Sequence, residues 1–214
     1  MKIYKIPHPL QTIIFDIDST LYTNAAYAFE QVDVQVRHYA ALNGISDEEA
    51  RQKVSDYRKR WAAEHGGQKI SLANTLLSFG VPIATSVEWR KTLIEPADFL
   101  GEDKALIAAL SALKQKYRLI CVTNNPALPA QKTLDALRIS SLIEDIIALD
   151  TCWVSKPARE PFALAAQKTG AAESACLSVG DRYDIDLALP LEMGMGAIEV
   201  AGVQDVYELP SVLS

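Results

Sequence analysis

The sequence has few of the residues on which disulfide frameworks, zinc sites and nucleic-acid-binding faces depend. It holds three cysteines, Cys121, Cys152 and Cys176, and this odd number at wide spacing argues against a disulfide framework or a zinc site. Lys and Arg number 21 against 27 Asp and Glu, giving a net charge of −6. A diffuse nucleic-acid binder needs a basic face, so no nucleic-acid polymer is expected as a partner. An acidic chain can still bind a small anion where positive groups are concentrated.

Long apolar runs are absent as well. No stretch approaches the length that spans a bilayer, and the first residues, MKIYKIPHPLQ, lack the apolar region of a signal peptide. We therefore expect a cytoplasmic protein that does not bind membranes. The chain has 214 residues, of which 49% are hydrophobic and 22% charged. It can bury a core and has the size of one domain, or of one domain with a smaller insertion.

The first half of the chain predicts a strand followed by helices. Residues 12–15 form a short apolar, β-branched run that reads as a buried strand. Helical spacing then begins, with apolar residues at Phe29, Val32, Val36 and Ala40. Ser46 and Glu49 form the capping box of a second helix. No convincing strand lies between Tyr22 and Pro96, so this segment is predicted to be an all-helical insertion.

The second half alternates between helices and strands. Helices are expected at residues 102–116, 129–137 and 161–169, with a short one from about 185. Strands are expected at residues 118–122, 146–149, 175–179 and 197–200. Such alternation predicts an α/β domain with a parallel sheet covered on both faces. We place this core at residues 1–21 and 98–214, and the inserted helical domain at residues 22–97.

Polar residues follow each of the predicted strands. In open parallel sheets, ligands bind beyond the carboxyl ends of the strands, so these residues are expected to meet at one sheet edge. Taken alone, each group could be an ordinary turn or helix cap. Their coincidence at successive strand ends favours a functional site. The residues in question are Asp16, Asp18, Thr123, Asn124, Asn125, Lys156, Asp181, Asp184 and Asp186.

The residue types predict phosphoryl chemistry at this edge. Clustered carboxylates repel one another, and their oxygens suit Mg²⁺ rather than zinc. The metal and the Lys156 ammonium would attract a phosphate. Asp16 is placed to act as a nucleophile that forms an aspartyl-phosphate. Asp18 is placed to protonate the leaving oxygen and later to deprotonate water.

These motifs resemble those of the haloacid dehalogenase superfamily, in its phosphatase branch. FDIDSTLY is similar to the first motif, VTNN to the second, SKP to the lysine of the third and VGDRYDID to the acidic fourth. They occur in family order, and the resemblance covers the whole chain. It implies a Rossmann-like core, and the insertion after the first motif looks like the family's helical cap. FDIDSTLY and the later DYRKRW also resemble the pyrimidine 5′-nucleotidase-like group.

The resemblance implies a role for each site residue. Asp16 would be the nucleophile and a metal ligand, and Asp18 the general acid/base, binding the metal through its backbone carbonyl. Thr123 and Asn124 would hold the transferring phosphoryl group, while Lys156 would neutralise its charge. Asp181 would be a direct metal ligand. Either of two residues could be the second acid of the fourth motif. We choose Asp186, which fits the GDxxxxD spacing, and keep Asp184 as the alternative.

The expected function is an Mg²⁺-dependent phosphomonoesterase that acts on a small phosphorylated metabolite, such as a nucleoside monophosphate or a sugar phosphate. A phosphomutase would keep every one of these motifs and is the runner-up. A dehalogenase of the same fold needs neither Asp18 nor a metal, so the presence of Asp18 counts against that activity. A receiver-type signalling domain is much shorter and lacks the helical insertion, so this non-enzymatic alternative is less favoured. The sequence leaves the physiological substrate open, and it also leaves open whether the protein is a homodimer.

Overall fold

The computed structural model describes all 214 residues, and the chain divides into two compact units. The first unit comprises Met1–Asn24 and Pro96–Ser214, and the second comprises Ala25–Glu95. None of the helices combines the length and the apolar composition that crossing a membrane would require.

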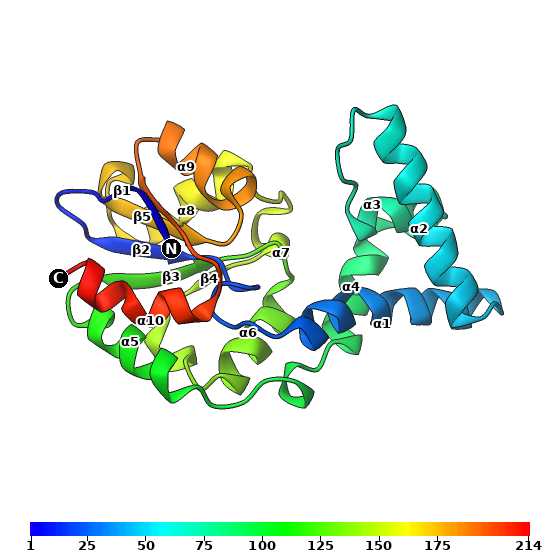
Figure 1. Ribbon diagram of the computed structural model, residues 1–214, viewed down its shortest axis with the longest axis horizontal. Coiled ribbons are helices and arrows are strands. Elements are labelled where there is room, and N and C mark those ends of the chain that lie inside the picture. The colour runs from blue at the N-terminus through cyan, green and yellow to red at the C-terminus, as the bar shows by residue number, and fades with distance from the viewer. The chain divides into compact units, whose positions relative to one another are not determined.

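A six-stranded sheet forms the centre of the first unit (Figure 1). Its strands lie in the order β1-β6-β5-β2-β3-β4, and all neighbours are parallel except β1, which is antiparallel to β6. This confirms the predicted α/β class with a mostly parallel sheet. The strands are β1 (Lys2–Lys5), β2 (Thr12–Phe15), β3 (Arg118–Val122), β4 (Ile146–Ile147), β5 (Cys176–Gly180) and β6 (Gly196–Glu199).

Helices cover both faces of this sheet. Figure 1 shows α5, α6 and α10 on one face and α8 and α9 on the other. Their bounds are α5 (Lys104–Lys114), α6 (Ala127–Ala136), α7 (Leu149–Cys152), α8 (Arg159–Thr169), α9 (Ala188–Glu192) and α10 (Val203–Val212). The unit also contains the short 3-10 helices η1 (Pro96–Asp98), η2 (Ser140–Leu142) and η3 (Glu173–Ala175), and the π-helical turn η4 (Tyr183–Leu187).

The first predicted strand lies in the middle of the sheet. All four residues of β2 are buried, as expected for a strand covered on both faces. Its last residue, Phe15, pairs in register with Cys121 of β3 and with Val179 of β5. The three strands therefore end at the same level, and the residues that follow them are delivered to one edge of the sheet.

The second unit contains four helices and no strand: α1 (Ala25–Asn43), α2 (Asp47–Glu64), α3 (Leu72–Ser78) and α4 (Ile83–Leu93). The capping box predicted at the start of α2 is present, with the Ser46 hydroxyl accepting from the Glu49 amide and the Glu49 carboxylate accepting from the Ser46 amide. The small core of this unit is apolar and includes Val36, Tyr39, Ala40, Val54 and Leu76.

Three elements differ from the sequence prediction. β1 was not expected, because its residues are largely exposed and show no buried face. The strand expected at residues 146–149 ends after Ile147, since the Thr151 hydroxyl accepts from the Ala148 amide at 3.0 Å and starts the helical turn α7. α10 was also missed. Its buried residues Val203, Val206 and Leu209 repeat every third position, which was the available signal.

Candidate active site

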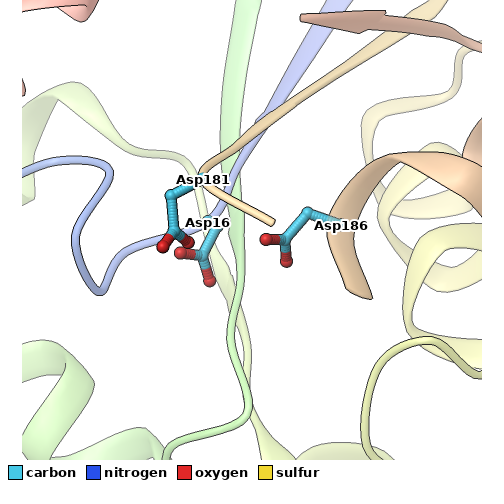
Figure 2. Close-up of side chains that lie close together, drawn as sticks. All are labelled: Asp16, Asp181 and Asp186. Carbon is cyan, nitrogen blue, oxygen red and sulfur yellow. The ribbon is translucent and has the colours of Figure 1, made fainter. Parts of the chain in front are cut away.

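Three carboxylates meet at the carboxyl edge of the sheet. Asp16 follows β2, Asp181 follows β5, and Asp186 lies in the turn η4. One oxygen from each lies within 4.8 Å of the others, and Figure 2 shows the carboxyl group of Asp186 directed toward the other two. Register explains the first two positions, because β2 and β5 are paired neighbours. The arrangement concentrates negative charge at the end of the buried central strands.

Lys156 is the buried cation within this cluster. Its ammonium donates to Oδ1 of Asp16 at 2.6 Å and to Oδ1 of Asp186 at 2.6 Å. Burial by itself would lower the pKa of Lys156, but the Asp16 and Asp186 carboxylates together raise it. Lys156 is therefore held as an ammonium ion between the two acids.

The cluster leaves negative charge uncompensated. Burial is the main cause that raises the pKa of Asp16, although Lys156 acts against it. Burial, followed by the charges of Asp16 and Asp186, raises the pKa of Asp181 to about 6. Three carboxylates thus share one buried ammonium ion.

The two acids left open in the fourth motif have different surroundings. Asp184 is exposed, whereas Asp186 is buried. Besides its bond to Lys156, Asp186 accepts from the Arg182 amide at 3.1 Å through Oδ2, and its backbone carbonyl accepts from the Ser178 hydroxyl at 2.7 Å. The π-helical geometry of η4 turns Asp186 inward, so the structure brings this acid, and not Asp184, to the cluster.

Asp18 lies outside the three-carboxylate group. Its Oδ1 accepts from the Tyr22 hydroxyl at 2.5 Å, and its Oδ2 accepts from the Asn125 amide at 2.8 Å. The Thr123 hydroxyl lies 3.5 Å from the same Oδ2. Sequence reasoning did not identify Tyr22 and Asn125 as partners of this acid. Asp18 and Tyr22 lie at either end of a tight turn that includes Ser19 at a φ of 62°, and no sequence signal indicated the contact.

Asn124, which the resemblance implied would hold the phosphoryl group, is bonded to the loop that carries Lys156. Its side-chain oxygen accepts from the Lys156 amide at 2.7 Å, and its side-chain nitrogen donates to the Lys156 carbonyl at 3.2 Å. Both ends of the amide thus bind the backbone of the lysine loop. Asn124 contributes to the site by fixing Lys156, while its neighbour Thr123 is buried at the end of β3.

The donor set fits a hard divalent cation. Asp16, Asp181 and Asp186 offer only carboxylate oxygens, the ligands that Mg²⁺ prefers, and no sulfur or imidazole ligand belongs to the group. The three negative charges exceed the single charge of Lys156, so a bound cation would offset repulsion that the protein leaves in place. Asp16 and Asp181 would hold it, with Asp186 beside them.

A family model, described as "Hydrolase: haloacid dehalogenase-like hydrolase", matches residues 10–194. This chain belongs to the haloacid dehalogenase-like hydrolases. The matched segment includes every site residue described above, and the family predicted from the four motifs is thereby confirmed.

Individual relatives of this hydrolase include more than one activity. A curated relative, the glyceraldehyde 3-phosphate phosphatase of Methanopyrus kandleri, is 24% identical over 198 residues, which are 89% of this chain and 84% of the relative. Among solved structures, a HAD phosphatase from Thermococcus onnurineus matches with a TM-score of 0.66 at 18% identity, covering 96% of this chain and 98% of the other. A 2-haloacid dehalogenase from Pseudomonas syringae pv. tomato matches with a TM-score of 0.59 at 18% identity, covering 95% and 98%. These structural likenesses establish the fold, and the reaction must be argued from the site.

Proposed function

We propose that this hydrolase is an Mg²⁺-dependent phosphomonoesterase that acts on a small phosphorylated metabolite through an aspartyl-phosphate. The observation that carries the proposal is the contrast between two aspartates only two residues apart. Asp16 lies in the carboxylate cluster and binds Lys156, whereas Asp18 lies outside the cluster and is held by Tyr22 and Asn125. Two acids in different surroundings suit two different roles. A dehalogenase would need a nucleophile such as Asp16 but no general acid/base at the position of Asp18.

The proposed reaction has two steps, transfer of the phosphoryl group to Asp16 and hydrolysis of the aspartyl-phosphate. A carboxylate oxygen of Asp16 attacks phosphorus, and the bond from phosphorus to the ester oxygen breaks. Asp18 gives its proton to that leaving oxygen. Water then attacks phosphorus, Asp18 takes a proton from the water, and the bond between Asp16 and phosphorus breaks. Lys156 offsets the negative charge at the reacting centre in both steps. A bound Mg²⁺ would supply further positive charge at the phosphoryl oxygens.

The substrate class is inferred from similarity to named proteins. The phosphatase relative acts, by its name, on a phosphorylated triose, which favours a sugar phosphate or a similarly small ester. The resemblance to pyrimidine 5′-nucleotidases keeps nucleoside monophosphates in the same test panel. We also propose that the helical unit Ala25–Glu95 serves as the cap domain.

The assignment of the two aspartates is tested by trapping the intermediate. Asp16→Asn should abolish both turnover and phosphoenzyme, because an amide is a far weaker nucleophile. Asp18→Asn should retain attack on 4-nitrophenyl phosphate, whose leaving group needs little protonation, but should hydrolyse the intermediate slowly. Intact-protein mass spectrometry after acid quench should show a phosphate adduct on Asp18→Asn alone.

Two further results would contradict the proposal. Full phosphatase activity in EDTA would exclude the metal dependence. Release of chloride from 2-chloropropionate by the wild type, without hydrolysis of any phosphate ester, would assign the chain to the dehalogenase chemistry of its family instead.

A further inference from the structure

The helical unit contains a groove of its own between α1 and α2. It has a volume of about 490 Å³. Its walls are mostly apolar, and two of the apolar residues, Phe29 and Val32, are 61% and 39% exposed. The apolar lining residues are Phe29, Val32, Val36, Val54 and Ala62. Single apolar side chains scattered over a surface are ordinary, whereas these five line one continuous groove.

One half-buried cation in the groove has no partner. The Nε of Arg58 is shielded from solvent and makes no hydrogen bond, and Arg58 forms no ion pair. The nearby acid Asp33 is already engaged, since it accepts from Arg51 at 2.7 Å and 2.8 Å and also pairs with Arg37. The groove therefore contains a paired acid, the unpaired guanidinium of Arg58 and the exposed ammonium of Lys59.

The position of Arg58 is unusual for an arginine. Long cationic side chains commonly lay their apolar stem on a surface and keep the charged head in water. In Arg58 a donor of the head itself is buried, and burial lowers its pKa with no neighbouring carboxylate to act against it. A guanidinium is built to bind a carboxylate or phosphate with two parallel hydrogen bonds, and in Arg58 the two Nη groups, unlike Nε, are not shielded and can be reached from the groove.

We propose that the α1–α2 groove is a binding site for a small organic anion, in which Arg58 pairs with a carboxylate or phosphate and the apolar walls hold an apolar body. Charge complementarity selects this occupant over a purely apolar one, because an apolar occupant would bury the Arg58 charge further without pairing it. The proposal concerns the helical unit by itself and does not depend on the phosphatase assignment.

The test compares two ligands that differ only in charge. The probes are 4-phenylbutyrate and its neutral analogue 4-phenylbutanamide, titrated into the full-length protein by isothermal titration calorimetry. We expect the carboxylate to bind about 10-fold more tightly, the order expected for one hydrogen-bonded ion pair. In Arg58→Gln this preference should fall below about twofold. Arg58→Leu, which keeps an apolar side chain in the groove, should give the same loss and serves as a second variant if Arg58→Gln folds poorly.

Matched controls separate the groove from general charge and from the active site. Arg60→Gln removes an equal charge from the same helix but does not line the groove, so it should keep the preference. Phe29→Ser should weaken both probes about equally. Asp16→Asn, which alters the catalytic cluster, should leave both affinities unchanged.

Methyl NMR locates the bound probe. The resonances of Val32, Val36 and Val54 should shift on addition of 4-phenylbutyrate to the wild type, and should shift much less in Arg58→Gln. Equal affinity of the two probes for the wild type, a preference that survives in Arg58→Gln, or valine resonances that do not respond would each overturn the proposal.

Discussion

Replacing Lys156 with methionine tests the electrostatic argument at its centre. The ammonium lies 2.6 Å from Oδ1 of both Asp16 and Asp186, and its side chain is 2% exposed. Methionine keeps most of the volume and removes the charge. Three clustered carboxylates, including Asp181, would then have no buried cation among them.

The variant should lose both stability and activity. Removing one partner of a buried ion pair typically costs about 3–5 kcal/mol, because the remaining charge stays buried and unpaired. The loss in turnover should be on the order of 10²-fold or more, as for the removal of one electrostatic stabiliser from an active site. Added Mg²⁺ should restore part of the stability, since it would compensate the same carboxylates.

The stability deficit should depend on pH in a defined direction. Burial raises the pKa of Asp16, and Lys156 is the main influence that lowers it. Without Lys156 this pKa rises further, so the folded variant binds more protons than the unfolded chain. Stability then falls as pH increases, and the deficit relative to wild type should be larger at pH 8 than at pH 5.

The assay is urea unfolding in EDTA at several pH values, together with turnover of 4-nitrophenyl phosphate in Mg²⁺. Lys168→Met is the matched control, because Lys168 also lies 2.6 Å from a carboxylate, that of Asp145, but the two side chains are 44% and 41% exposed. It should cost less than about 1 kcal/mol and leave turnover unchanged. Equal and small effects of the two substitutions would refute the reasoning.

Three other substitutions give further predictions. Asn124→Ala should reduce kcat about 10-fold with little change in KM, because the amide fixes the backbone of Lys156, the proposed electrostatic stabiliser, through two hydrogen bonds. Steady-state kinetics measures this, and a change confined to KM would instead indicate that Asn124 binds the phosphate. Gly180→Ala should destabilise the fold by about 1–3 kcal/mol and impair activity, because a Cβ there would lie 2.4 Å from Cβ of Asp186; Gly101→Ala, with open space around it, is the control in thermal unfolding. Asp33→Asn should destabilise the helical unit by about 1–3 kcal/mol at neutral pH. Hydrogen bonds from its arginine partners lower the pKa of Asp33, so this difference should begin to shrink as pH falls below about 4, where the unfolded chain takes up the proton, and should continue to shrink toward lower pH. Thermal unfolding followed by circular dichroism at pH 7, 4 and 3 measures this, and a difference that stays constant over that range would contradict it.

Local patterns in the sequence determined much of this protein. The apolar run at residues 12–15 predicted the buried central strand, and the Ser46–Glu49 pair predicted the start of α2, because both signals act over a few residues. The order of polar groups after successive strands predicted which residues meet at the sheet edge. Parallel strands deliver their carboxyl ends to the same side, so this part of the site needed no tertiary information.

Only the tertiary structure decided how these groups face one another. Asp184 and Asp186 are equally acidic in the sequence, and the π-helical turn η4 buries one of them and exposes the other. No pattern in the sequence indicated that the Asn124 amide binds the backbone of a loop 32 residues away. Likewise, the lack of a partner for Arg58 depends on Asp33 being taken by two other arginines. Side-chain direction and competition for partners depend on residues distant in the chain, and these are the terms that a local pattern does not contain.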